Sequence, residues 1–134
     1  MKNSAKSIAF WGSIVTGLLL IFIGARFFLV PEAATTAFGI NVSTNGNHSF
    51  QYIKGIRDIF TGGIILLLLF TKEFRALGFA LLLGCIIPTV DFLIVITRSQ
   101  FDVNHTYAHL SAILICVPLG MYYLGVSRAK AGRQ

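Results

Sequence analysis

The sequence contains few charged residues and offers too little polar surface for a water-soluble globule. Only 12% of its 134 residues are Asp, Glu, Lys or Arg, whereas 55% are hydrophobic, and an ordinary soluble domain is about 25% charged. A chain of this length cannot bury so many long apolar runs inside one soluble core. The composition therefore excludes an ordinary soluble domain and predicts a single domain whose apolar surface is covered by lipid.

Several motifs that mark common enzymes are missing. The sequence has no nucleophilic-serine elbow, no phosphate-binding glycine loop and no dinucleotide fingerprint, which disfavours hydrolysis by those routes and nucleotide chemistry. The two cysteines, Cys85 and Cys116, lie inside apolar runs without Cys-x-x-Cys spacing, so we expect small buried hydrophobic residues there. We expect no cofactor and no metal, because His105 and His109 alone are a weak metal signal.

The net charge of +6 does not indicate nucleic-acid binding, because most basic residues flank apolar runs and no nucleic-acid motif is present. The distribution of these residues predicts the orientation of a multi-pass membrane protein, since cytoplasmic ends carry the excess of Lys and Arg. Seven basic residues fall on one side and four on the other, which predicts that both termini are cytoplasmic. The seven are Lys2, Lys6, Lys72, Arg75, Arg128, Lys130 and Arg133, and the four are Arg26, Lys54, Arg57 and Arg98.

Four apolar segments are each long enough to cross a bilayer as an α-helix, because about 20 residues suffice. They lie near residues 8–29, 52–70, 74–96 and 108–126. The first is about 22 residues long, more than a usual signal-peptide core, so we expect it to be a retained helix. The sequence therefore predicts an all-α fold, an integral membrane four-helix bundle formed by one domain over residues 1–134.

The first two segments are joined by a link that contains a helix signal. Pro31 and Glu32 suit a helix start and Gly39 suits a stop, so we expect a short interfacial helix, with a plain surface loop as the alternative. This helix would bring Phe38 against the mouth of the bundle as a lid. The second and third segments are joined only by residues 71–73, which predicts a tight antiparallel hairpin.

Small residues within the apolar segments allow helices to approach closely. The pairs are Ser13 with Gly17, Gly62 with Gly63, and Ala80 with Gly84. They predict tight packing either within one chain or between two copies, so a homo-oligomer remains open.

Five ionisable residues lie at a similar predicted depth, in the outer half of the bilayer, and they come from all four segments. A charge at mid-membrane costs roughly 2.5–3.5 kcal/mol on insertion scales, so these side chains should face one another instead of lipid. We expect them to form a polar ligand site. They are Arg26, Arg57, Asp58, Asp91 and His109.

The simplest neutral arrangement pairs Arg26 and Arg57 with Asp58 and Asp91, because two guanidinium and two carboxylate groups sum to zero. Asp58 with Arg26 and Asp91 with Arg57 are the pairs we consider, without ranking them. Pro88 adds a polar group, since it cannot donate a hydrogen bond to the carbonyl of Gly84.

Each residue also has a simpler interpretation. Both arginines can reach the outer head groups along their own side chains, and the two aspartates can form a purely structural ion pair. His109 can bind a backbone carbonyl at a helix end. If the site is catalytic, Asp58, Asp91 and His109 are the candidate acid and base groups for isomerising or cyclising a lipophilic substrate.

The segment from Gly24 to His109 resembles small four-helix DoxX-like membrane proteins, and more closely an associated group described only as a domain of unknown function. The residues that carry the resemblance are Gly24-Ala25-Arg26, Pro31, Phe38-Gly39, Gly55-Ile56-Arg57-Asp58, Gly62, Pro88-Thr89-Val90-Asp91 and His109. The resemblance implies the four-helix membrane fold. DoxX-like proteins are linked to quinone-coupled sulfur oxidation and other membrane roles, but the cysteine pair or haem-type motif that would serve such a role is missing here.

The sequence thus predicts a membrane protein, in contact with lipid, that binds a small lipophilic or amphiphilic molecule in a polar pocket of the outer half of the bundle. One alternative is a membrane enzyme with acid/base chemistry. The other is a structural or accessory subunit, whose charged residues only hold the helices together.

Overall fold

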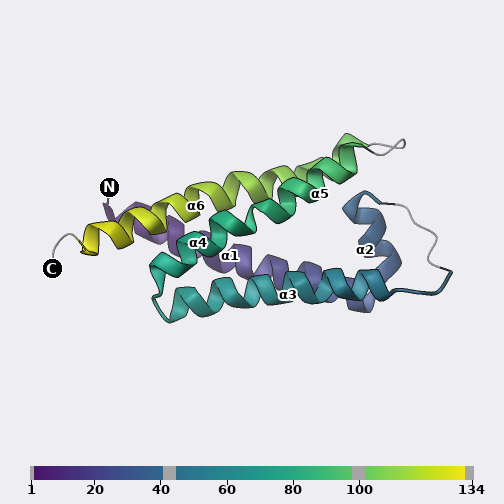
Figure 1. Cartoon of the computed structure of the whole chain (residues 1–134), viewed down its shortest axis with the longest axis horizontal. Coiled ribbons are helices and arrows are strands. Elements are labelled where there is room, and N and C mark those ends of the chain that lie inside the picture. Colours follow the sequence, from purple (N-terminus) through teal and green to yellow (C-terminus); the bar gives the residue numbers. More distant parts are fainter. Residues whose placement is uncertain (1, 41–44, 98–101, 132–134) are drawn as a thin grey trace.

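The computed structural model describes residues 2–40, 45–97 and 102–131, and every regular element in these ranges is a helix. Figure 1 shows two layers of long helices that lie close together near the chain termini and separate toward the opposite end. The lower layer contains α1 (Lys2–Leu29) and α3 (Ser49–Phe70), and the upper layer contains α4 (Phe74–Gly84), α5 (Ile86–Ile96) and α6 (Tyr107–Ala131). The short helix α2 (Pro31–Phe38) lies between the layers at the open end, and the 3-10 turn η1 (Val103–Thr106) precedes α6.

Helices α1 and α3 pack backbone against backbone because glycines meet along their interface. A Cβ atom added to Gly24 would lie 2.5 Å from the carbonyl oxygen of Gly55 and 2.9 Å from the backbone nitrogen of Ile59. A Cβ on Gly62 would collide with the carbonyl oxygen of Gly17. The two glycines on each helix are seven residues apart, so they lie on the same face two turns from each other.

The predicted small-residue contacts are therefore only partly confirmed. Gly17 and Gly62 lie in the interface, and Ser13 is fully buried, with its hydroxyl donating to the carbonyl of Ala9 at 2.9 Å. Gly63 and Gly84 make no close contact within the chain, since a Cβ on either would meet no atom within 4 Å, and contact between two copies there stays a prediction. Helix periodicity alone does not say which face of a helix meets a neighbour.

The third predicted segment is one apolar stretch interrupted at Cys85, between α4 and α5. Pro88 explains the interruption, because it has no N–H to donate to the carbonyl four residues earlier. The next residue, Thr89, donates to the carbonyl of Cys85 through both its backbone N–H, at 3.2 Å, and its hydroxyl, at 2.7 Å. The α4 portion packs closely on α6, where a Cβ on Gly78 would lie 3.0 Å from the carbonyl oxygen of Gly120.

The apolar core lies at the closed end of the two layers, near the chain termini. It is formed by the start of α1, the end of α3, the start of α4 and the later part of α6. Tyr123 of α6 contacts two other helices at this end. Its ring stacks on Phe74 of α4, and its hydroxyl donates to the carbonyl of Ala9 in α1 at 3.0 Å. The other buried core residues are Ile65, Leu69, Leu77, Leu81, Cys85, Cys116 and Leu119.

Three helical stretches among the described residues are long and apolar enough to cross a membrane, which indicates a membrane protein. They are Ser4–Leu29, Phe74–Ile96, which includes the break at Cys85, and Val103–Ala129. Their positions agree with three of the four predicted segments, 8–29, 74–96 and 108–126, although the first and last helices extend further at their ends.

Helix α3, with 22 residues, is long enough to cross a bilayer but carries charged residues within its apolar sequence. Lys54, Arg57 and Asp58 lie in its first half, and every stretch of 18 residues within it contains all three. The remaining predicted segment, 52–70, is thus a helix, although its apolar character is interrupted by the charges that form the candidate site.

Candidate functional site

Four charged side chains from α3 and α5 form a network of ion pairs near the open end of the layers. The ammonium nitrogen of Lys54 lies 2.8 Å from Asp58 Oδ2 and 3.8 Å from Asp91 Oδ2. The guanidinium of Arg57 contacts Asp58 Oδ1 through Nε at 3.4 Å and Asp91 Oδ2 through Nη2 at 3.2 Å. We call these four residues the charge cluster. Its formal charges sum to zero.

The structure brings together three of the five residues predicted for the site. The pairing of Asp91 with Arg57 is found, and it connects α3 to α5. The other pairing we considered is wrong, because Asp58 contacts Lys54 and Arg57 of its own helix instead of Arg26. Arg26, half-buried in the last turn of α1, forms no ion pair with any described residue.

Lys54 was absent from the predicted site, yet it is the residue that replaces Arg26 in the charge balance. The sequence contained a signal for it, since Lys54 and Asp58 are four residues apart and can meet on one helix face. A lysine near a helix end is usually expected to extend toward the head groups. The structure instead holds its ammonium over the Phe38 ring at 4.3 Å and near the Phe27 ring at 5.0 Å.

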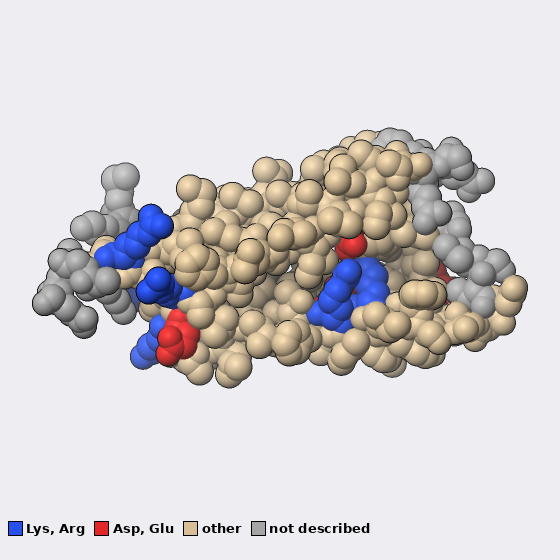
Figure 2. Space-filling model, viewed as in Figure 1, with Lys and Arg blue, Asp and Glu red and all other residues tan. Residues whose placement is uncertain are grey.

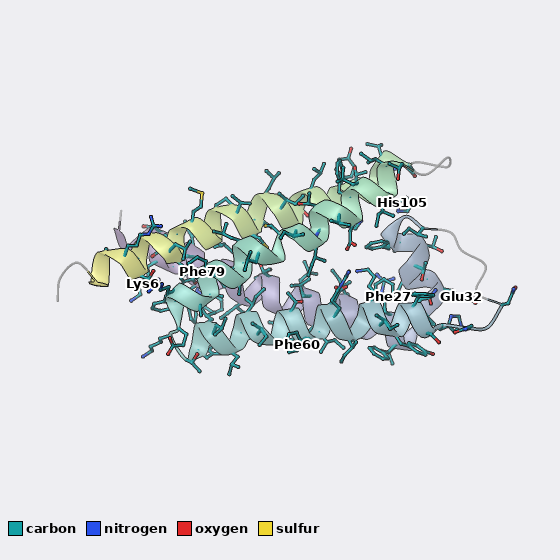
Figure 3. All side chains as sticks on the ribbon, viewed as in Figure 1. Lys6, Phe27, Glu32, Phe60, Phe79 and His105 are labelled. Carbon is teal, nitrogen blue, oxygen red and sulfur yellow. The ribbon has the colours of Figure 1, made fainter. Side chains whose placement is uncertain are left out.

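These two aromatic rings come from helices that the sequence alone could not place together. Phe27 is buried near the end of α1 and lies on the side facing α2, as Figure 3 shows. Its ring meets that of Phe38 edge to face, with centroids 6.4 Å apart. A cation within about 6 Å of an aromatic face is attracted to it, so both rings help to hold the Lys54 ammonium.

His109 is buried, but its ring contacts α2 and not a carboxylate of the charge cluster. Nε2 lies 3.4 Å from the carbonyl oxygen of Phe38, and the imidazole meets the Phe38 ring edge to face at 4.7 Å. This is the simpler interpretation of His109, a histidine bonded to a backbone carbonyl. His105 makes a similar contact one turn earlier, between Nδ1 and the carbonyl oxygen of Ala37 at 3.3 Å.

The end of α2 is thus held by two histidines from η1 and α6. Gly39 ends the helix in the left-handed conformation with φ of 95°, and a Cβ there would lie 2.7 Å from the Cβ of His105. The predicted short helix after the first segment is therefore confirmed as a helix. The Phe38 ring lies against the Lys54 ammonium of the charge cluster, and its role as a lid stays a prediction.

The charge cluster is accessible from one side of the molecule. Figure 2 shows basic side chains, with an acidic one beside them, in a hollow between the upper and lower layers away from the termini. The Arg57 side chain is 39% exposed, whereas its partners Asp58 and Asp91 are 6% and 13% exposed. The carboxylates are therefore less accessible than the guanidinium.

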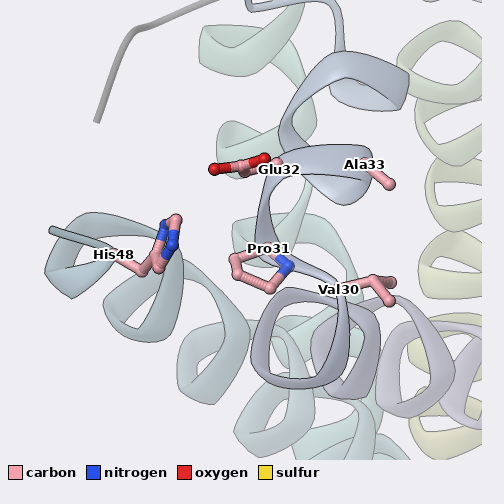
Figure 4. Close-up of a pocket in the computed structure, with 5 residues that line it drawn as sticks. All are labelled: Val30, Pro31, Glu32, Ala33 and His48. Carbon is pink, nitrogen blue, oxygen red and sulfur yellow. The ribbon is translucent and has the colours of Figure 1, made fainter. Parts of the chain in front are cut away.

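A second depression, of about 370 Å³, lies outside the bundle where α1 meets α2. Figure 4 shows the Glu32 carboxylate and the His48 ring at its edge, with Val30, Pro31 and Ala33 forming the remainder. It is separate from the charge cluster and contains no cationic group to match Glu32.

The model of one protein family matches residues 17–123, which include the whole charge cluster, and this family is described as Domain of unknown function (DUF4267). No curated protein and no solved structure matches the chain.

Proposed function

Because the chain belongs to the DUF4267 family, whose description assigns no function, we propose from its own residues that the charge cluster is the polar end of a binding site for a small lipophilic or amphiphilic molecule. The apolar part of that molecule would lie in the hollow between the layers, beside Phe38. Its polar part would contact Arg57.

The observation that carries this proposal is the uneven exposure within an otherwise paired cluster. Asp58 is nearly inaccessible, and both of its carboxylate oxygens contact a cation. Arg57, by contrast, keeps 39% of its side chain exposed while it contacts both aspartates. A network that only held helices together would have no need of an accessible guanidinium facing a hollow.

The membrane setting explains why affinity would come from this polar end. A lipophilic molecule gains little by moving its apolar surface from lipid to protein, because the lipid tails are equally apolar. A hydrogen bond to a charged donor contributes about 1.5–3 kcal/mol. Contact with Arg57 would therefore select one kind of molecule from the bilayer.

We also propose that α3 is a fourth membrane-crossing helix and that both termini lie in the cytoplasm. The close glycine contacts between α1 and α3 support this arrangement. If α1 crosses the bilayer, then α3, which packs antiparallel along it, would cross the bilayer too. The charge cluster would then lie within the outer half of the bilayer, with α2 near its interface. We further propose kinship with the DoxX-like four-helix proteins, on the sequence resemblance of segments that include 55–58 and 88–91.

The main rival is a structural role, in which the four charges only lock α3 to α5. It draws support from the complete internal charge balance and from the burial of Asp58. Catalysis by Asp58, Asp91 and His109 draws less support, because His109 contacts Phe38 and not a carboxylate.

Native mass spectrometry of the full chain, purified in a mild detergent, tests the binding proposal. We expect a reproducible bound small molecule with the unmodified protein. Arg57→Gln should lower its occupancy at least about tenfold, as expected for the loss of one charge-assisted hydrogen bond. The matched control is Arg75→Gln, which removes the same charge from an exposed position in the first turn of α4.

The two outcomes separate the proposals. A bound molecule that is retained by Arg75→Gln and lost from Arg57→Gln supports the site. Protein masses with detergent alone, or equal occupancy in both variants, would favour the structural role.

A further inference from the structure

The donor groups of Arg57 show which chemistry the hollow offers. A guanidinium has five N–H donors on three nitrogens and no acceptor. Nε contacts Asp58 Oδ1 at 3.4 Å and Nη2 contacts Asp91 Oδ2 at 3.2 Å. Among the described residues, Nη1 has no hydrogen-bond partner. The accessible guanidinium therefore keeps one edge of N–H groups for another acceptor.

Three of the four carboxylate oxygens of the charge cluster contact a cation, and the side chains of Asp58 and Asp91 are less exposed than that of Arg57. Both oxygens of Asp58 contact cations, and Oδ2 of Asp91 is shared by Lys54 and Arg57. The Lys54 ammonium is itself held between these carboxylates and the Phe38 ring, with its side chain only 18% exposed. A molecule that enters the hollow thus meets chiefly the donor edge of Arg57.

The charge balance limits what the incoming acceptor can be. The cluster is already neutral, so an anionic head group would bring an uncompensated negative charge beside Asp91 in a poorly solvated site. Removing such a charge from water is costly unless it finds a cation of its own. Arg57 is already shared between Asp58 and Asp91, whereas a neutral oxygen can accept its remaining donors without disturbing either pair.

We infer that the ligand of this site carries an uncharged hydrogen-bond acceptor, the carbonyl oxygen of a ketone or an ester, on an apolar body. The Nη1 group of Arg57 donates to that oxygen, and the apolar body lies against Phe38. This inference rests on the proposed binding function and names the class of molecule that it selects.

A series of ligands with matched apolar chains tests the inference on the full-length protein in detergent. The series comprises a long-chain methyl ketone, the alkane of the same length, and the fatty-acid anion of the same length at a pH where it is ionised. Titration followed by native mass spectrometry gives the dissociation constant of each. We expect the ketone to bind at least about tenfold more tightly than either of the others.

Variants of the donor complete the test. Arg57→Gln should abolish the preference for the ketone, and Arg75→Gln should leave it unchanged. If Arg57→Gln does not fold, Arg57→Lys keeps the charge that the aspartates require but has a single nitrogen to share. This variant should then bind the ketone only about as tightly as it binds the alkane.

The outcomes distinguish the class of ligand from the existence of a site. If the anion binds more tightly than the ketone and depends on Arg57, the ligand class is wrong and the binding function stands. If ketone, anion and alkane bind alike, or if changes at Arg57 have no effect, the binding function itself is wrong.

Discussion

Replacing Asp58 by asparagine is expected to destabilise the protein by about 3–5 kcal/mol, the usual cost of removing one partner from a buried ion pair. Asp58 is 5% exposed and contacts both cations of the charge cluster. Its loss as a carboxylate leaves Lys54 and Arg57 with only Asp91 between them, so the cluster gains a net positive charge. The free energy of unfolding, measured by denaturant titration in detergent, would show the loss.

Two further variants show whether charge is the cause. Adding Lys54→Met to Asp58→Asn restores neutrality and places a flexible apolar side chain against Phe27 and Phe38, so most of the lost stability should return. Glu73→Gln removes a carboxylate from an exposed position after α3 and should change stability by less than about 0.5 kcal/mol. An equal effect of Asp58→Asn and Glu73→Gln would show that the ion pairs contribute nothing to stability.

Replacing Gly24 by alanine is expected to cost about 1–3 kcal/mol, because the added methyl group overpacks the interface between α1 and α3. It would meet the carbonyl oxygen of Gly55 and the backbone nitrogen of Ile59, as well as Cγ1 of the Ile59 side chain. Backbone atoms cannot rotate aside as a side chain can, so the two helices would have to separate. Thermal unfolding in detergent measures the change.

Gly63→Ala is the matched control, because it makes the same chemical change in α3 where a Cβ meets no atom within 4 Å. There the substitution should stabilise the protein by up to about 1 kcal/mol, since alanine loses less backbone entropy than glycine in a helix. The two substitutions are thus expected to act in opposite directions. Destabilisation of similar size at both positions would mean that helix α1 does not contact α3 through Gly24.

The sequence predicts the helices of this protein better than their contacts. Long apolar runs predict the helices, residues 71–73 predict the sharp turn between α3 and α4, and Pro31 with Gly39 predicts α2. The interruption at Cys85 follows from the missing donor of Pro88. Which glycines touch depends on the register between α1 and α3, and this register arises from the packing of whole helix faces. Gly24 and Gly55 could therefore not be separated from Gly63 and Gly84 by spacing alone.

The candidate site was predicted in part for a similar reason. The positions of Arg57, Asp58 and Asp91 within their apolar segments predict a similar depth in the bilayer, and the structure pairs these residues. Depth gives no direction around a helix, and of the two pairings considered, Asp58 with Arg26 is not found because Asp58 contacts Lys54 and Arg57. The role of Lys54 depends on the rings of Phe27 and Phe38. Phe27 reaches it because α1 packs on α3, and Phe38 reaches it because α2 folds back between the layers.

The central claim is that the charge cluster lies inside the membrane between crossing helices, and the sidedness of α3 tests it most directly. Single cysteines at Lys6, Ser49 and Lys72, labelled in intact cells with a membrane-impermeant maleimide, report the two ends of α1 and α3. The unmodified protein is the control, since Cys85 and Cys116 are buried. We predict that only the cysteine at Ser49 reacts from outside, and that those at Lys6 and Lys72 react after the membrane is opened. Labelling of Ser49 and Lys72 from the same side would mean that α3 does not cross the membrane, and it would contradict this account.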